Sequence, residues 1–262
     1  MADAIRIGIL GAGGRMGREL MAQIAACDDL VLSAAVDRAG HPDMGTDIGG
    51  VALTDDAATA FQNCDCLIDF SAPGSTQNHA ALAGENRTAL VIGTTGLTEQ
   101  DHAVIDSAAK SAPIVQAGNF SAGIALMMAA VEMLAASLPG DAWDIEILDR
   151  HHKHKIDSPS GTALMLGDAA AAGRGTNLDD VRSDPYDGLH GERGAGKISF
   201  AAQRGGAVIG EHDVTFYGGH ERLTLSHKAE DRGLFAAGAL RAARFAASAK
   251  PGRYTLQDVL GL

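Results

Sequence analysis

The chain has 262 residues, of which 46% are hydrophobic and 21% charged, so it is long enough to form two hydrophobic cores. Acidic side chains outnumber basic ones by 33 to 21, which gives a formal net charge of −12. This balance argues against nucleic acid and against an anionic membrane surface as partners, because both require a basic face. It leaves open a small anionic ligand held in a locally basic pocket.

The beginning of the chain lacks the basic start and uninterrupted apolar core of a signal peptide. The longest apolar segment, residues 122–138, contains Glu132 and is typical of a packed helix rather than a membrane span. Three cysteines, Cys27, Cys64 and Cys66, do not form a disulfide framework or a zinc-site spacing. We therefore expect reduced thiols and a cytoplasmic protein.

The first 120 residues alternate short apolar runs with stretches of helical periodicity. Strands are predicted at residues 4–10, 30–36, 66–70, 89–92 and 113–116. Helices are predicted after the glycine-rich segment 11–14 and from the turn and capping residues at Pro73 and Thr98. Continuous apolar strands that alternate with helices are typical of a parallel sheet covered on both faces. The sequence therefore predicts an α/β fold with a doubly wound parallel sheet.

The pattern changes after Asn119. A long helix is predicted at residues 121–137, followed by a strand at 143–148, a charged loop and a helix that begins at Ser160. Strand-like segments at 197–202, 207–216 and 221–228 are joined by glycine turns at 204–206 and 218–220, which favour antiparallel hairpins. Residues 173–196 are interpreted as an exposed arm. Helices at 234–247 and 254–260, the second capped by Thr255, end the chain.

A glycine-rich loop follows the first predicted strand. The segment Gly11-Ala12-Gly13-Gly14-Arg15-Met16-Gly17 precedes a helix, and Asp37 ends the next strand, twenty residues after Gly17. Glycines permit a tight turn that brings backbone N–H groups to a pyrophosphate, and a carboxylate in this place accepts hydrogen bonds from ribose hydroxyls. The spacing departs from strict G-x-G-x-x-G, and a glycine turn without a ligand is the alternative. The context favours a dinucleotide site.

Three further features lie near the ends of predicted strands. Arg38 follows Asp37 and is either a contact for a 2′-phosphate, so that either nicotinamide dinucleotide could bind, or a solvated surface charge. The segments 93–96 (GTTG) and 118–121 (GNFS) close two other strands, at the edge where open parallel sheets bind ligands. We expect them near the nicotinamide half of the cofactor, although a helix cap is the simpler alternative for GTTG.

A dense cluster of basic residues lies at His151-His152-Lys153-His154-Lys155 in an otherwise acidic chain. Several groups that titrate near neutrality favour acid–base chemistry and anion binding. A solvated loop and a metal site are the alternatives. The lysines oppose a dication and the usual metal-ligand spacing is absent, so we predict no metal. Ser160-Gly161-Thr162 then begins a helix whose N–H groups suit a carboxylate, which points to a small dicarboxylate substrate.

Taken together, these motifs resemble those of a known family. The resemblance rests on the cluster His-His-x-His-Lys-x-Asp-x-Pro-Ser-Gly-Thr-Ala (151–163), the glycine loop and short motifs over nearly the whole chain, namely Asp69-Phe70-Ser71, Gly93 to Gly96, Asn119 to Ser121, Arg204 to Gly206, Gly210 to His212, Glu221 to Leu223, His227 to Ala229 and Leu256 to Leu260. These motifs are similar to those of the 4-hydroxy-tetrahydrodipicolinate (dihydrodipicolinate) reductases. Asp37 and Asp149 stand where the family more often has Glu.

The resemblance implies a fold and an assembly. It implies a Rossmann-type dinucleotide-binding domain of residues 1–120, completed by 231–262. It also implies a second, α+β domain of residues 121–230, with a mixed and largely antiparallel sheet, that binds substrate and builds a homotetramer. The implied activity is hydride transfer from NADH or NADPH to C4 of the substrate, with loss of water, on the route to diaminopimelate and lysine.

The resemblance also implies residue roles. His151 is the expected general acid/base and Lys155 a proton donor. The expected substrate-binding residues are His152, Gly161 and Thr162. The expected cofactor contacts are Gly11, Ala12, Gly13, Gly14, Arg15, Met16, Asp37, Arg38, Gly93, Thr94, Thr95, Ala117, Gly118, Asn119 and Phe120.

Two other classes of function remain open on the residues alone. Another two-domain NAD(P)-dependent oxidoreductase would also combine a lysine and a histidine in its second domain. An acylating semialdehyde dehydrogenase is disfavoured because no cysteine lies beyond Cys66. A dinucleotide sensor without catalysis would keep the glycine loop but would not need His151, His152 and Lys155 together.

Overall fold

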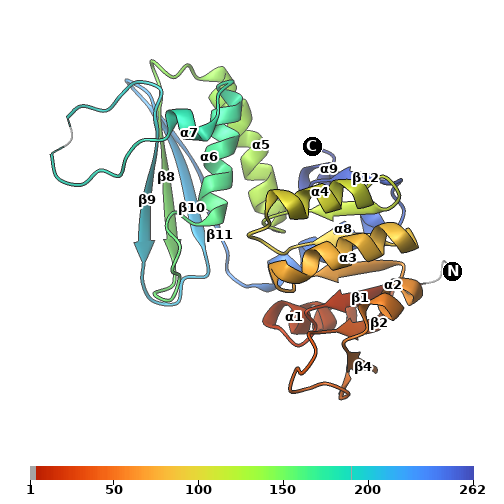
Figure 1. The fold of residues 1–262 in the computed structure, drawn as a ribbon. Coiled ribbons are helices and arrows are strands. Elements are labelled where there is room, and N and C mark those ends of the chain that lie inside the picture. The colour runs from red at the N-terminus through yellow and green to blue at the C-terminus, as the bar shows by residue number, and fades with distance from the viewer. Residues whose placement is uncertain (1–3, 190) are drawn as a thin grey trace. The chain divides into compact units, whose positions relative to one another are not determined.

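The computed structural model describes residues 4–189 and 191–262. The chain divides into two compact units, one made of the residues up to Phe120 together with Gly233–Gly261, the other of Ser121–Arg232 with Leu262. Figure 1 shows a separate sheet in each unit. No helix among the described residues is both long enough and apolar enough to cross a membrane.

In the part of the first unit that the structure describes, eight strands form one sheet. They are β1 (Ile5–Leu10), β2 (Leu30–Val36), β3 (Asp47–Ile48), β4 (Val51–Thr54), β5 (Cys66–Asp69), β6 (Ala89–Ile92), β7 (Pro113–Gln116) and β12 (Gly252–Tyr254). The strand order is β12-β7-β6-β5-β1-β2-β4-β3, and every neighbouring pair is parallel except β3 with β4. The strands β2, β3 and β4 lie on one side of β1. The later strands, beginning with β5, lie on its other side. The order therefore reverses between β1 and β5, which is where sheets of this kind bind ligands.

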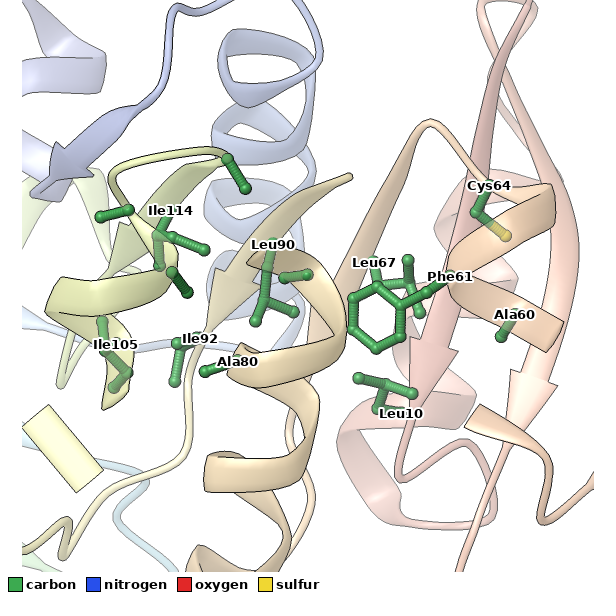
Figure 2. Packing of buried hydrophobic residues seen from close by; sticks show 14 of the residues in the cluster. Leu10, Ala60, Phe61, Cys64, Leu67, Ala80, Leu90, Ile92, Ile105 and Ile114 are labelled. Atoms are coloured by element: carbon green, nitrogen blue, oxygen red, sulfur yellow. The ribbon is translucent and has the colours of Figure 1, made fainter. Parts of the chain in front are cut away.

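Helices cover both faces of this sheet. They are α1 (Arg15–Ile24), α2 (Ala57–Asn63), α3 (Pro73–Asn86), α4 (Glu99–Ala108), α8 (Gly233–Ala246) and α9 (Leu256–Leu260). The helix α1 packs against α8, and α3 packs against both α2 and α4. Figure 2 shows Phe61 of α2 and Ala80 of α3 packed against strand residues such as Leu67 and Leu90, all of which are buried. The predicted Rossmann-type fold is confirmed.

The described residues of the second unit form four strands and three helices. They are β8 (Asp144–His151), β9 (Ile198–Arg204), β10 (Glu211–Tyr217), β11 (Arg222–Lys228), α5 (Ala122–Ser137), α6 (Gly161–Gly173) and α7 (Leu178–Val181). The order is β11-β10-β8-β9, with β8 parallel to β9 and the other two pairs antiparallel. The predicted mixed, largely antiparallel sheet is therefore confirmed.

The burial of β8 decides where its functional side chains lie. Alternate residues of a strand face opposite sides of a sheet, and burial alternates along β8 with that period. Ile145 and Ile147 belong to the core that includes residues of α5 and α6. Asp149 and His151 lie on the same face, 0% and 9% exposed. The apolar core thus determines the direction of the next two polar side chains.

Several details differ from the sequence predictions. The first strand of the second unit, β8, extends to His151, so Asp149 and His151 belong to a strand and not to the predicted charged loop. The glycine turn at 204–206 does not close a hairpin, because β8 lies between β9 and β10 and pairs with both. The turn at 218–220 does join the antiparallel strands β10 and β11. The elements β3, β4, α2 and β12 were not predicted; the strands among them have two to four residues.

The predicted arm at 173–196 contains the short helix α7 and an isolated bridge from Arg182 to Ile198. Part of it, at position 190, lies outside the described residues. Cys64 and Cys66 are buried and Cys27 is partly exposed, all three as free thiols. Burial raises the pKa of Cys64 to about 11 and raises that of Cys66 further, so both remain protonated thiols at neutral pH.

Candidate active site

The glycine loop of the first unit can form only with glycine at two of its positions, because a side chain there would collide with backbone atoms. Gly11 has a φ of +84°, and a Cβ on it would lie 2.9 Å from the carbonyl oxygen of Phe70. A Cβ on Gly17 would lie 2.5 Å from the carbonyl oxygens of both Gly11 and Ala12. The loop therefore packs tightly between β5 and α1. The first-turn N–H groups of α1, which begins at Arg15 after the N-cap Gly14, have no partners within the helix and attract anions.

A cavity of about 520 Å³ lies beside this loop, at the reversal between β1 and β5. Its lining includes the predicted residues Gly11, Gly14, Asp37 and Arg38. It also includes residues that were not predicted: Leu10, Val36, Ala39, Asp55, Ala57, Phe70, Ser71, Ala72, Gly74, Ser75, Asn78 and His79. An elongated anionic ligand with a ribose fits this lining, because it combines a helix N-terminus with a carboxylate.

The carboxylate of Asp37 has two backbone donors. Its Oδ2 accepts from the Gly13 N–H at 2.9 Å, and its Oδ1 accepts from the Arg38 N–H at 2.8 Å. The imidazole of His41 also packs against Gly13 and leaves no room for a Cβ there. Asp37 is thus fixed at the end of β2 beside the glycine loop, as the sequence predicts for a ribose-binding acid.

The other predicted cofactor residues follow β6 and β7 at the same edge of the sheet. Thr94 is buried, with its hydroxyl 3.3 Å from both Asp69 Oδ1 and the carbonyl oxygen of Ser71. A Cβ on Gly93 would lie 2.3 Å from the ring of Phe70, which itself packs edge-on against Phe120. Gly93, Thr94 and Phe120 therefore hold the strand-end loops in place. Thr95, Ala117, Gly118 and Asn119 are partly or fully exposed.

Buried Asp69 organises this edge and was missed as a site residue. Its Oδ1 accepts from both the N–H and the hydroxyl of Ser71, and its Oδ2 lies 2.8 Å from Nδ1 of His79. The side chain is 0% exposed. The sequence places Asp69 at the end of an apolar strand and in one of the short family motifs, but its partner His79 lies ten residues away in a predicted helix, so the contact itself was not predicted.

The catalytic candidate of the second unit is His151, at the end of β8. Its Nδ1 lies 2.5 Å from Oδ1 of Asp149, which is fully buried. Burial opposes ionisation of this carboxyl group, but hydrogen bonds from His151, the Ser160 N–H and Arg204 outweigh it and hold the pKa of Asp149 far below its usual range. The ionised carboxylate accepts the Nδ1 proton of His151, which leaves Nε2 for exchange with a substrate.

The loop after β8 carries the other predicted cationic residues. Lys155 Nζ forms an ion pair with Asp157 at 2.8 Å. The Nδ1 of His152 is buried and has no hydrogen-bond partner among the described residues. Burial, together with the charges of Arg232, His151, His154 and Lys155, lowers the pKa of His152. An unpartnered nitrogen beside several cations fits an anionic ligand that supplies the missing partner.

The N-terminus of α6 is capped within the same unit. The Ser160 hydroxyl accepts from the Ala163 N–H at 3.2 Å, and the Ser160 N–H donates to Oδ2 of Asp149 at 2.6 Å. A Cβ on Gly161 would meet no atom within 4 Å, so open space lies beside the first turn. The helix N-terminus offers backbone N–H groups and a positive dipole end to a carboxylate. This is where Gly161 and Thr162 were predicted to bind the substrate.

One potential cation site overlaps these residues. Asp149, His151 and His212 each place a ligand atom within 4.8 Å of the others. Both oxygens of Asp149 already accept hydrogen bonds, and the Arg204 guanidinium lies 3.1 Å from Oδ2. A guanidinium at this distance opposes a dication. These three residues are therefore poorly suited to bind a metal ion.

His212 belongs to one of the short motifs shared with the family but is not among the predicted site residues. Its Nε2 lies 3.1 Å from the Ser160 hydroxyl, and its ring packs edge-on against His151 at 5.2 Å. Burial lowers the pKa of His212 to about 4, assisted by the charges of His151, His227 and Lys155, while Asp149 acts in the opposite direction. His212 is therefore neutral at pH 7.

The lowered pKa of His212 predicts that the folded protein loses stability at acidic pH. The folded value of about 4 lies below the ordinary 6.5, so the unfolded chain binds the proton first as the pH falls. We expect His212 to contribute no pH dependence above 6.5 and to cost about 3 kcal/mol of stability by pH 4. Chemical denaturation between pH 7 and pH 4 measures the free energy of unfolding of the wild type and of His212→Gln, whose side chain does not titrate. The wild type should lose more stability than the variant. An equally steep loss in the variant contradicts the assignment.

Comparisons with known proteins identify the family. The sequence matches the family described as dihydrodipicolinate reductase, N-terminus, over residues 5–120, and the one described as dihydrodipicolinate reductase, C-terminus, over residues 123–260. It is 48% identical over 271 residues to the 4-hydroxy-tetrahydrodipicolinate reductase of Parvibaculum lavamentivorans, with 100% of both chains covered. It is 50% identical over 268 residues to that of Rhizobium rhizogenes, covering 99% of this chain and 98% of the relative.

A solved structure agrees with these matches. The dipicolinate-bound dihydrodipicolinate reductase from Paenisporosarcina sp. TG-14 is 26% identical, with a TM-score of 0.80 over 97% of this chain and 99% of that one. A probable dehydrogenase from Thermotoga maritima, 13% identical with a TM-score of 0.64, shares the fold alone over 97% of this chain and 92% of its own. The chain belongs to the dihydrodipicolinate reductase family.

Proposed function

We propose that the protein reduces 4-hydroxy-tetrahydrodipicolinate with NADH or NADPH, and that His151 and Lys155 move protons while His152, Gly161 and Thr162 bind the substrate. The reductase activity and the nicotinamide cofactor follow from the family, whose named relatives match almost the whole chain. The observation that supports the residue roles is that β8 and α6 bring an acid–base imidazole and an anion-binding helix end to the same carboxylate.

The reaction consumes a hydride and a proton. A C–H bond forms at C4 of the substrate, the C4–O bond breaks, and the leaving hydroxyl group departs as water. The product is tetrahydrodipicolinate, an intermediate on the route to diaminopimelate and lysine. Release of the hydroxyl group as water requires a proton donor near the reacting ring, and this is the role for which the second unit supplies His151 and Lys155.

The protonation of His151 follows from its contacts. Because Nδ1 faces Oδ1 of Asp149, the ring exchanges protons with a substrate through Nε2. The space beside this nitrogen depends on Gly210, where a Cβ would lie 3.0 Å from Nε2. Lys155 is a cationic donor whose present partner, Asp157, is a carboxylate. A dicarboxylate substrate competes with Asp157 for this ammonium group.

The substrate carboxylates match two features of the second unit. One is the first turn of α6 at Gly161 and Thr162, beside which there is open space. The other is His152, whose buried Nδ1 has no partner among residues 4–189 and 191–262. Hydrogen bonds to ionised carboxylates are stronger than neutral ones, so both features favour a dianionic ring over a neutral sugar.

The first unit fits the dinucleotide. The tight glycine loop, the cavity beside it and the fixed carboxylate of Asp37 suit a pyrophosphate and a ribose. When bound, the nicotinamide ring supplies the hydride. The residues proposed to hold the dinucleotide are the loop residues Gly11, Ala12, Gly13, Gly14, Arg15 and Met16, then Asp37 and Arg38, and the strand-end residues Gly93, Thr94, Thr95, Ala117, Gly118, Asn119 and Phe120.

A direct assay tests this proposal. We expect the purified protein to oxidise NADH, NADPH or both when 4-hydroxy-tetrahydrodipicolinate is supplied, measured as the loss of dihydronicotinamide absorbance. Omission of the substrate is the control and leaves the absorbance constant. Dinucleotide binding without turnover on this substrate contradicts the proposal and supports a sensor.

We also propose that the protein is a cytoplasmic homotetramer. The three free thiols support a reducing compartment. Partly exposed Tyr217 and Leu223, 40% and 42% exposed at the ends of β10 and β11, support association through the second sheet. Light scattering that gives the mass of one chain contradicts the tetramer.

A further inference from the structure

We propose that Asp149 is a positioning residue that joins the proton-transferring His151 to the carboxylate-binding end of α6. The inference rests on the proposed function for the roles of these two groups. Asp149 itself has no exposed surface and therefore does not touch the substrate. It acts through the two groups that it holds.

The two oxygens of the Asp149 carboxylate have different partners. Oδ1 lies 2.5 Å from Nδ1 of His151, and Oδ2 accepts from the Ser160 N–H at 2.6 Å. Ser160 is the N-cap of α6, immediately before Gly161 and Thr162. One planar group thus fixes both the acid–base ring and the start of the helix. Any movement of the carboxylate displaces both.

The contact with Oδ1 also selects the form of His151. An ionised carboxylate only accepts hydrogen bonds, so Nδ1 must carry a proton in this arrangement. The neutral ring then presents an unprotonated Nε2, which can take up a proton and then deliver it to the leaving hydroxyl group. The Arg204 guanidinium, 3.1 Å from Oδ2, keeps the carboxylate ionised. The hydrogen bond to Asp149 thus determines that Nε2, and not Nδ1, is the nitrogen of His151 that exchanges protons.

The neighbouring strand β10 provides a second link between β8 and the N-terminus of α6. Asp149 on β8 pairs directly with His212 on β10, and Nε2 of His212 lies 3.1 Å from the Ser160 hydroxyl. The Ser160 backbone is therefore held by Asp149 and its side chain by a neutral histidine in the adjacent strand. The sheet, rather than the loop at 152–159, therefore determines the distance between the N-terminus of α6 and the His151 ring. Rigid elements hold catalytic groups more accurately than loops do.

An asparagine at position 149 separates this role from simple packing. Asn has nearly the same size but only one acceptor oxygen, so its amide N–H₂ must face either His151 or the Ser160 N–H. We expect Asp149→Asn to lower kcat by about 10²-fold or more, because the ring loses its orientation and tautomer. The KM for 4-hydroxy-tetrahydrodipicolinate should rise because the end of α6 shifts. The KM for the dinucleotide should stay unchanged, because its proposed site is in the first unit.

Two variants serve as comparisons. Asp149→Glu keeps two acceptor oxygens and should recover part of kcat. Asp213→Asn removes a carboxylate from the same sheet, where Asp213 bonds Arg150 on the side of β10 opposite His212, and should leave kcat unchanged. Equal kcat in Asp149→Asn and Asp213→Asn overturns the proposal, and so does an Asp149→Glu variant that is no better than Asp149→Asn.

A measurement without turnover keeps this test independent of the proposed function. Nitrogen-15 NMR of histidine-labelled wild-type protein, assigned with His151→Gln, should show His151 protonated at Nδ1 when neutral. A neutral ring protonated at Nε2 overturns the proposal even if Asp149→Asn fails to fold. Failure of the wild-type protein to reduce the substrate instead overturns the proposed function, and the NMR result still decides the role of Asp149.

Discussion

Replacement of His151 by Gln should abolish most of the turnover while dinucleotide binding survives. The imidazole is the group whose Nε2 is left to exchange a proton, since Nδ1 is held by Asp149. A glutamine amide does not titrate near neutral pH, so the proton that converts the leaving hydroxyl into water has no ready donor. We expect kcat to fall by about 10²- to 10⁴-fold, the range for loss of a general acid or base. Steady-state kinetics measures this loss.

The dinucleotide affinity of His151→Gln is its internal control. The glycine loop and Asp37 belong to the first unit, whereas His151 belongs to the second. Fluorescence titration with NADH should therefore give the wild-type dissociation constant. Turnover within a few-fold of wild type would remove His151 from the mechanism, whereas a parallel loss of dinucleotide binding would indicate a folding defect.

Replacement of Gly17 by Ala should have the opposite signature, with a large loss of dinucleotide affinity. The added Cβ would lie 2.5 Å from the carbonyl oxygens of Gly11 and Ala12, which are backbone atoms and cannot swing aside. The glycine loop must move away from α1, which takes the N–H groups of the loop away from the proposed pyrophosphate site. We expect the dissociation constant to rise about tenfold or more, and a stability cost of about 1 to 3 kcal/mol from overpacking.

Gly219→Ala is the matched control for this substitution. Gly219 lies in the turn between β10 and β11, and a Cβ on it would meet no atom within 4 Å. It should leave both dinucleotide affinity and thermal stability near wild type. A Gly17→Ala variant that binds the dinucleotide as tightly as Gly219→Ala would show that the loop is not the pyrophosphate site.

Much of the first unit follows from local sequence. Its apolar strands are continuous and buried, as in β6, where all four residues have little exposure. Capping residues also identify helix starts, because Thr98 and Thr255 each form a capping box with the aspartate three residues later. The short elements β3, β4 and β12 carry no such signal. They owe their structure to neighbouring strands, and tertiary pairing overrides weak local propensity.

The site could be predicted only in part. The glycine loop and the basic cluster stand out because their chemistry is concentrated in a few adjacent residues. The contacts of Asp149 with Ser160 and with Arg204 span 11 and 55 residues, so no local pattern reveals them. The same holds for Asp69 with His79, and for Gly210 beside Nε2 of His151. Residues that support catalytic groups come from several strands, and only the fold brings them together.

In the proposed reaction a hydride reaches C4 of 4-hydroxy-tetrahydrodipicolinate and the hydroxyl group there leaves as water. Reduced dinucleotide carrying deuterium at the transferring position tests it most directly. The product, analysed by mass spectrometry and NMR, should contain one deuterium, located at C4, together with loss of the 4-hydroxyl group. Deuterium at another carbon, or a product without deuterium, would contradict hydride transfer to C4.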